Sequence, residues 1–168
     1  MALIAVIALA LGMAPLVGQN WGAGLYNRVH ESINLSITYN FIWSFFVAAI
    51  LAIFASHIGY GFSSDPEIIK YIALYLWMIP VTNGFGNLVF GWSSAFNAMG
   101  SPQRSFAMIS AKAFLMTIPA VLLGSYFYGV PGIFLAIALS NIASGVFFHV
   151  LSWRACLKRE HPAPVAAS

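Results

Sequence analysis

Long apolar runs, separated by short segments rich in turn-forming residues, dominate the sequence. Five runs are candidates for membrane-spanning helices, which need about 20 predominantly apolar residues; they cover residues 1–17, 36–58, 68–96, 106–128 and 131–152. The first run is barely long enough. It lacks the basic flank and the clear small-residue cleavage site of a signal peptide, so we predict a helix of the mature protein, with a cleaved leader as the alternative.

The segments between the runs contain residues that end and begin helices. Asp-Pro-Glu at 65–67 predicts an N-cap, a proline at the first helical position and an acid near the positive end of the helix dipole. Ser101 and Pro102 repeat this arrangement before the fourth run, with Ser101 as the expected cap. Gly-Val-Pro-Gly at 129–132 predicts a very tight turn before the fifth run.

The composition excludes a soluble globule. The 168 residues are 61% hydrophobic and 7% charged, whereas a soluble domain carries about 25% charged residues. Cys156 is the single cysteine, and a net charge of +3 is too small and scattered for nucleic-acid binding. We predict an all-α, polytopic membrane helical bundle of five transmembrane helices in residues 1–155, surrounded by membrane lipids, and a cytoplasmic tail in residues 156–168.

The basic residues are distributed unevenly between the two sides of this bundle. If the spans alternate in direction, only Lys70 falls on one side; the other side receives Arg28, Arg104, Lys112, Arg154, Lys158 and Arg159. Cytoplasmic loops carry the excess of Lys and Arg, so we expect the N-terminus outside and the C-terminus in the cytoplasm. Lys112 lies inside the fourth run, and we expect its long side chain to reach back to the inner headgroups.

Small residues at every fourth position predict contact faces between helices. Lipid tails solvate apolar side chains as well as a protein does, so close approach of backbones at small residues drives association. The first and fifth helices carry such rows: Ala10, Ala14, Gly18 and Gly22, and Gly132, Ala136, Ser140 and Ser144.

The middle of the third run is the most unusual segment. Pro80 interrupts this run, as Pro15 interrupts the first, and each proline predicts a helix kink. Asn83 and Asn87 follow Pro80 and share one helix face, because they are four residues apart. Polar amides at membrane depth are costly unless they face protein or a watery cavity. Hydrogen bonding between helices and lining of a solute cavity are both open interpretations.

No residue pattern for catalysis or metal binding emerges. The histidines at 30, 57, 149 and 161 do not lie at ligand spacing with another histidine, cysteine or acid on one membrane level. Neither a nucleophile elbow nor a phosphate-binding loop occurs. We therefore expect no enzyme, no catalytic residues, no metal site and no cofactor.

Acidic residues are missing from the predicted membrane interior. Between residues 36 and 152 the only carboxylates are Asp65 and Glu67, in the connection before the third span. A carrier driven by protons or sodium ions normally needs a carboxylate at membrane depth. Either the protein does not couple to an ion, or the coupling residue lies on another part.

Two motifs resemble the multidrug and toxic compound extrusion (MATE) transporters. Ala-Pro-Leu-Val-Gly-Gln-Asn-Trp-Gly-Ala-Gly at 14–24 is similar to the family's Pro-x-x-Gly-Gln-x-x-Gly-Ala-Gly signature. Ser-Ala-Phe-Asn-Ala-Met-Gly-Ser-Pro at 94–102 resembles its small-residue and Gly-x-Pro turn two helices later, and the turn at 129–132 also suits the family. The resemblance covers nearly the whole chain and is to the last five helices of the C-terminal lobe.

This resemblance implies a function. Members have twelve helices in two six-helix lobes around a substrate cavity, and exchange cytoplasmic cationic or amphipathic compounds for external sodium ions or protons by alternating access. The chain would be part of such a multidrug efflux antiporter in the bacterial cytoplasmic membrane, and is not expected to act alone. The residues implied to line the cavity are Gln19, Trp77, Thr82, Asn83 and Asn87.

The resemblance is incomplete in one respect. Some members have an acidic residue on the corresponding third span for ion coupling, and this chain has none. The coupling acid is therefore expected in the N-terminal lobe or first C-lobe helix of a full-length parent. Two alternatives remain: a lipid-linked sugar flippase of the same superfamily, which basic residues facing the cavity would favour, and a non-transporting five-helix membrane scaffold.

Overall fold

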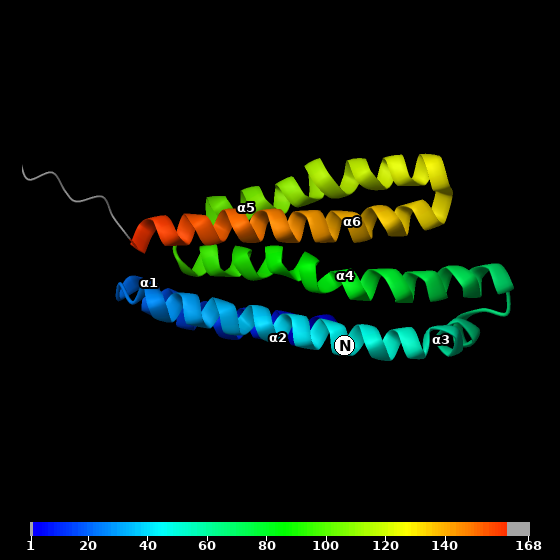
Figure 1. The fold of residues 1–168 in the computed structure, drawn as a ribbon, viewed down its shortest axis with the longest axis horizontal. Coiled ribbons are helices and arrows are strands. Elements are labelled where there is room, and N and C mark those ends of the chain that lie inside the picture. Colours follow the sequence, from blue (N-terminus) through cyan, green and yellow to red (C-terminus); the bar gives the residue numbers. More distant parts are fainter. Residues whose placement is uncertain (1, 161–168) are drawn as a thin grey trace, which may run out of the picture.

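The computed structural model describes residues 2–160, and the side chains of residues 12–156, as a bundle of long helices (Figure 1). The predicted all-α architecture is confirmed. In chain order the elements are α1 (Ala2–Gly22), α2 (Tyr26–Ile53), α3 (Ala55–Phe62), α4 (Pro66–Ala98), α5 (Pro102–Ser110), the π-helical segment η1 (Ala111–Thr117) and α6 (Ile118–Glu160).

The tight turn predicted at 129–132 divides α6 into two antiparallel limbs. Gly129 has φ 60° and ψ −138°, a conformation outside the helical region that glycine adopts without a steric penalty. The first limb continues from α5 and η1 as one rod, and the second limb returns along it (Figure 1). Gly124 and Gly132 allow the two limbs to approach closely, since a Cβ atom at either position would collide with the other residue's backbone.

The two predicted helix starts have different outcomes. Asp65 caps α4 as expected, because its Oδ1 accepts the N–H of Glu67 at 2.8 Å. The cap predicted at Ser101 is wrong: its side chain makes no capping hydrogen bond, although Pro102 does open α5. The Ser101 N–H instead donates to the Phe96 carbonyl at 2.8 Å, and Gly100 has φ 73°, so this turn terminates α4.

Several helices extend beyond the apolar runs. Helix α2 begins at Tyr26, before the second apolar run starts at residue 36, so His30 lies in this helix. Polar residues can continue a helix past the hydrocarbon core because they then lie at the headgroups. Helix α6 continues to Glu160, past the boundary predicted after residue 155, and residues 161–168 of the predicted tail lie outside the described residues.

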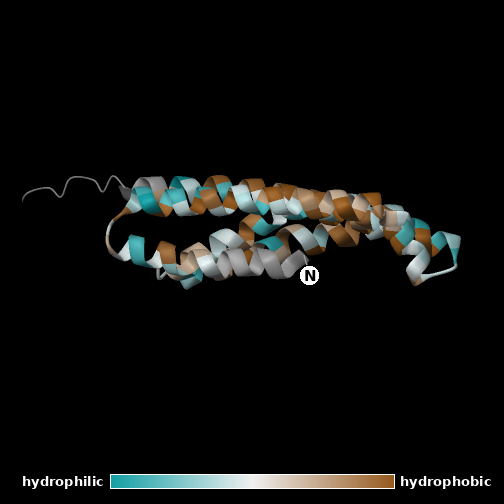
Figure 2. Ribbon diagram, turned by 90° about the horizontal axis from the view of Figure 1, so that it is seen from below, coloured by the Kyte–Doolittle hydropathy of each residue, from teal (hydrophilic) through white to brown (hydrophobic). Residues whose placement is uncertain are grey.

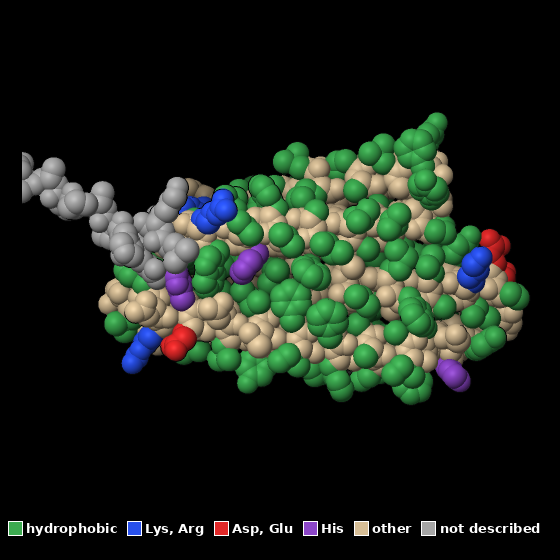
Figure 3. All heavy atoms as spheres, in the orientation of Figure 1, with side chains coloured by type: hydrophobic (Ala, Val, Ile, Leu, Met, Phe, Trp, Pro, Cys, Tyr) green, Lys and Arg blue, Asp and Glu red, His purple; other side chains and the backbone are tan. Residues whose placement is uncertain are grey.

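Apart from Lys112, the charged residues of the described chain lie toward the two ends of the bundle. The α1–α2 connection, the α4–α5 connection and the end of α6 lie at one end, whereas the α3–α4 connection and the Gly129 turn lie at the other (Figure 1). Arg28, Arg104 and Arg154 therefore belong to the first end, and Lys70 to the second. Figure 3 shows hydrophobic side chains covering most of the face between these ends.

The exterior matches a lipid environment. Among the described residues, three helical stretches are long and apolar enough to cross a membrane: Tyr26–Ile53, Pro66–Ala98 and Pro102–Cys156. The third contains the reversal at Gly129, so it supplies two crossings. Figure 2 shows hydrophobic positions concentrated over the middle of the bundle. The chain is a membrane protein.

The best-packed apolar core lies toward the end that carries the α1–α2 and α4–α5 connections. Val17 of α1, Val29 of α2 and Val89 of α4 are completely buried there, and the Trp92 side chain is 2% exposed. Met108 of α5 and Phe148 of α6 complete the contact between these helices. This core fixes α4 among its neighbours.

Glycines permit the closest contacts of α4. Gly18 of α1 faces the Ala98 carbonyl, where a Cβ atom would lie 3.2 Å from the oxygen. Gly145 of α6 packs directly on the backbone of Phe85, and an added Cβ atom would collide with that carbonyl. Gly18 belongs to a predicted small-residue row, whereas Gly145 lies next to the row that ends at Ser144.

We predict that Gly145→Ala destabilises the bundle by about 1–3 kcal/mol, because the added methyl group overpacks the α4–α6 contact. The matched control is Gly91→Ala, which also changes a helical glycine but meets no atom within 4 Å. Thermal unfolding of the purified chain in detergent should give a lower melting temperature for Gly145→Ala and an equal or higher one for Gly91→Ala. Equal melting temperatures would refute the close contact.

Candidate functional site

A continuous set of polar residues joins α4, η1 and the second limb of α6, and we call it the polar seam. Its members are buried or half-buried between these helices and contact one another through side chains or backbone carbonyls. The polar seam consists of Thr82, Asn83, Gly86, Lys112, Thr117, Ser140, Asn141 and Ser144.

Asn141 connects α6 to α4. Its side chain is 9% exposed, and its Nδ2 lies 3.5 Å from both the Thr82 hydroxyl and the Asn83 Oδ1. These are long hydrogen bonds that hold the amide loosely. The two residues on α4 belong to the amide-rich segment singled out in the sequence, so interhelical hydrogen bonding accounts for part of that pattern.

Gly86 provides the space in which the polar seam assembles. A Cβ atom at this position would lie 2.6 Å from the Asn141 Oδ1 and 3.1 Å from the Lys112 Nζ. Any larger residue would therefore push both side chains away. The glycine also leaves its own carbonyl accessible to the Lys112 ammonium.

Lys112 enters the polar seam from η1. Its Nζ donates to the Gly86 carbonyl at 3.1 Å and lies 5.5 Å from the centre of the Phe90 ring, within cation–π range. The expectation that Lys112 reaches the headgroups is wrong. The Gly86 carbonyl and the face of the Phe90 ring both contact the ammonium. The side chain therefore extends across the bundle to α4 and not along η1 toward the headgroups.

The depth of this contact follows from helix geometry. Gly86 lies twelve residues before the end of α4 at Ala98, or about 18 Å at 1.5 Å per residue. A helix of 33 residues is about 50 Å long, and the hydrocarbon core is about 30 Å thick. If α4 is centred in the bilayer, the Lys112 ammonium lies inside the hydrocarbon core.

The Lys112 ammonium has no acidic partner in this part of the chain. The only carboxylates between residues 36 and 152 are Asp65 and Glu67. Glu67 lies nineteen residues from Gly86 on α4, which corresponds to about 28 Å along the helix. A half-buried positive charge therefore has only neutral oxygens and one aromatic ring beside it.

The backbone around Lys112 is also unusual. Residues Ala111–Thr117 form a π-helical segment, a rare geometry that occurs frequently at functional sites. At the end of this segment the Thr117 hydroxyl lies 2.7 Å from that of Ser140, and the Ser144 hydroxyl donates to the Ser140 carbonyl at 2.6 Å. The widened helix thus faces α6 through paired hydroxyls.

The opposite side of α4 has its own polar contact, with α2. Asn40 is buried, and its Nδ2 donates to the Gly84 carbonyl at 2.8 Å. Its Oδ1 has no hydrogen-bond partner among the described residues. Both faces of the glycine-rich segment of α4 are therefore held by an asparagine from a neighbouring helix.

The structure brings together some of the residues predicted to line a cavity. Thr82 is buried and Asn83 half-buried in the polar seam, and Asn87 lies one turn further along α4, half-buried. Trp77 is 62% exposed, and Gln19 is exposed near the end of α1, away from the polar seam. A role in lining a cavity remains a prediction for all five residues.

The proline kinks also remain predictions. Pro15 and Pro80 lie inside α1 and α4 as expected. Figure 1 shows α4 changing direction near its middle.

Sequence reasoning missed Asn141 and misplaced Lys112. Asn141 follows Ser140, a member of the predicted small-residue row, and an amide in the middle of an apolar run is a readable signal. For Lys112 the signal was the charge itself inside the fourth run. Its partner, the Gly86 carbonyl, is a backbone group, and no sequence pattern points to it.

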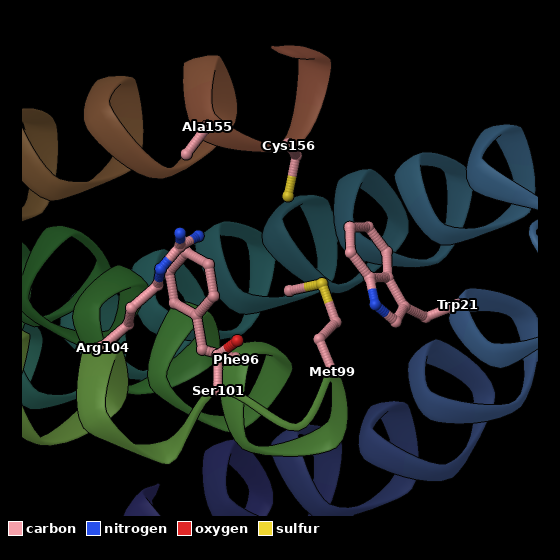
Figure 4. Close-up of a pocket in the computed structure, with 7 residues that line it drawn as sticks. All are labelled: Trp21, Phe96, Met99, Ser101, Arg104, Ala155 and Cys156. Atoms are coloured by element: carbon pink, nitrogen blue, oxygen red, sulfur yellow. The ribbon is translucent and has the colours of Figure 1, made fainter. Parts of the chain in front are cut away.

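A second group of polar and aromatic residues lies at the end where α5 begins. A shallow pocket there is lined by Trp21, Phe96, Met99, Ser101, Arg104, Ala155 and Cys156 (Figure 4). The Arg104 guanidinium lies 5.8 Å from the centre of the Phe96 ring. Nearby, the Trp92 indole N–H donates to the His149 Nδ1 at 3.0 Å, and His30 stacks on Trp153. These contacts fasten α1, α2, α4 and α6 together.

The fold and the polar seam define an integral membrane helical bundle with a polar interior. A family model described as MatE matches residues 1–123. The chain belongs to the MATE family, whose members are transporters and not enzymes.

The relatives place this family assignment in context. The chain is 30% identical over 154 residues to a protein of Shewanella oneidensis named FAD transporter, a match that covers 92% of this chain and 34% of the relative. An inward-facing multidrug resistance MATE transporter of the MOP superfamily superposes with a TM-score of 0.88 at 15% identity, over 96% of this chain and 38% of that one. An outward-facing structure gives 0.89 at 14% identity, over 96% and 37%. The chain spans about a third of the length of these relatives.

Proposed function

We propose that the chain forms part of a secondary-active antiporter that exports amphipathic small organic molecules and takes up sodium ions or protons by alternating access. Membership of the MATE family carries this proposal. The fold matches an inward-facing and an outward-facing transporter equally well, with TM-scores of 0.88 and 0.89. This equality supports a unit that keeps its internal structure while the transporter changes conformation. The match to the MatE family model favours a transporter over a non-transporting scaffold.

The chain would act as one part of a larger membrane protein. We infer that it corresponds to the last five helices of a MATE transporter and needs the remaining two-thirds of such a protein to act. It would lie in the bacterial cytoplasmic membrane with its N-terminus outside and the C-terminal tail of residues 156–168 in the cytoplasm. Gln19, Trp77 and Asn87 are proposed to line the substrate cavity together with Thr82 and Asn83.

The coupling ion would bind on another part of the transporter. In the described spans, Asp65 and Glu67 are near one end of α4 and far from the polar seam. A coupling site for sodium ions or protons normally includes a carboxylate at membrane depth. We therefore place this carboxylate in the portion of a full-length transporter that the present chain does not span.

Two substrate classes are consistent with the family. The first is cationic or amphipathic drugs, in keeping with the structural relative that is described as a multidrug resistance transporter. The second is FAD, which the curated relative is named for, and its 30% identity over 92% of this chain favours it. A lipid-linked sugar flippase of the same superfamily is less well supported because the family model that matches is MatE.

A chimera tests the transport function. The chain would replace the region of the Shewanella oneidensis FAD transporter that it matches over 154 residues. We expect the chimera to export FAD or the dye cation ethidium, and the chain alone to export neither, because the chain supplies only part of a carrier. Cellular ethidium fluorescence and FAD in the medium are the measurements. A folded, membrane-inserted chimera that exports neither would contradict the proposal.

Site-directed labelling tests the orientation. Cys156 is the single cysteine, so Cys156→Ser provides a background for Ser64→Cys before α4 and Asn27→Cys at the start of α2; both positions are exposed. We expect a membrane-impermeant maleimide to label Ser64→Cys in intact cells and Asn27→Cys only after permeabilisation. The opposite pattern would invert the proposed topology.

A further inference from the structure

Lys112 is a positive charge without a partner of opposite sign. Intramembrane lysines normally pair with an acid or face a watery cavity. The described part of the bundle offers Lys112 one backbone carbonyl and one aromatic ring, and the acids of α4 lie at its far end. Neutral contacts compensate an ammonium less well than an anion does. The charge is therefore poised to accept an anionic group.

The surroundings of Lys112 fit an anion better than a second cation. The atom of Asn141 that lies beside Gly86 is its Oδ1, which only accepts hydrogen bonds, so the Lys112 ammonium is the group there that can bind an anion. No carboxylate in these spans would repel an anion. A cationic substrate, in contrast, would meet the Lys112 ammonium directly.

Lys112 is also accessible from one side. Its side chain is only half-buried, and Phe90, which lies under the ammonium, is 52% exposed. The ammonium thus stands at the edge of the polar seam, where an incoming group can reach it. The π-helical geometry of Ala111–Thr117 sets the angle from which Lys112 reaches Gly86.

We propose that the Lys112 ammonium, at the Gly86 carbonyl, binds a phosphate or carboxylate group of the transported substrate. This assignment rests on the proposed transport function and narrows it to anionic substrates. The substrate oxygen accepts a charge-assisted hydrogen bond from Nζ and replaces or shares the bond that now goes to the Gly86 carbonyl.

Two flavins that differ by one phosphate group test the assignment. Riboflavin is uncharged, and flavin mononucleotide carries a phosphate. Binding of each to the purified chain in phosphatidylcholine nanodiscs can be measured by flavin fluorescence anisotropy. We expect flavin mononucleotide to bind about tenfold or more tightly than riboflavin, as for one charge-assisted hydrogen bond.

Three variants identify the responsible group. Lys112→Gln should remove the preference for flavin mononucleotide, whereas Lys112→Arg should keep it, because arginine retains the charge. The matched control is Lys70→Gln on the same bundle, since Lys70 is exposed at the start of α4 and should not affect either flavin. Melting temperatures in nanodiscs show whether each variant is folded, and Lys112→Arg keeps the test valid if Lys112→Gln unfolds.

Equal binding of the two flavins by the unmodified chain, including no binding of either, would overturn the assignment. So would a phosphate preference that survives in folded Lys112→Gln. An unchanged preference in Lys70→Gln, together with its loss in Lys112→Gln, supports the assignment.

A second arm distinguishes the substrate from a carboxylate of the transporter itself. In the chimera with the Shewanella oneidensis relative, Lys112→Gln should lower export of flavin mononucleotide about tenfold and leave export of ethidium unchanged or higher. Equal loss of both exports would indicate a structural ion pair with the transporter and would overturn the substrate assignment. If the unmodified chimera exports nothing while nanodisc binding shows the phosphate preference, the transport proposal fails and the anion site stands.

Discussion

The close approach of α4 and α6 is the contact on which the rest of the structure depends. In lipid, apolar side chains gain little by leaving their surroundings, so helices associate where their backbones can come together and where polar groups find partners. Gly145 brings α6 onto the backbone at Phe85, and Gly86, one residue further along α4, accommodates the side chains of Asn141 and Lys112. The glycines create the contact, and the amide and the ammonium occupy the space it leaves.

A consequence of this arrangement is that polar groups gather between α4, η1 and α6. The polar seam satisfies each group by hydroxyls, amides and carbonyls from three helical segments, yet it leaves one formal charge uncompensated within the described spans. In a transporter, such a charge can bind an anionic group of the substrate, which neutralises it. The MATE family assignment and the lone ammonium together connect the packing of α4 to a choice of substrate.

The sequence predicted local features of this fold, such as a helix cap and a turn, but not the contacts between distant residues. The cap at Asp65 and the reversal at Gly129 depend on residues within one turn, so their chemistry predicts them. The contact of Asn141 with Asn83 joins residues 58 positions apart, and periodicity says only that each lies on some buried face. The cap expected at Ser101 is wrong because the Ser101 N–H takes part in the turn that ends α4, where it donates to the Phe96 carbonyl. The position of Lys112 was not predicted because its acceptor, the Gly86 carbonyl, is a main-chain group.

The central claim is that the Lys112 ammonium stays inside the membrane, on the Gly86 carbonyl. The most direct measurement is the magnetic resonance spectrum of the chain with ¹⁵Nζ-labelled lysines in nanodiscs, with and without a water-soluble paramagnetic gadolinium chelate. The chain has three lysines, so the signals can be assigned by substitution. The structure predicts that the chelate broadens the Lys70 signal much more than that of Lys112, because Lys70 is exposed at the start of α4 and Lys112 is half-buried. Equal broadening of both would show that Lys112 reaches the headgroups and would contradict this account.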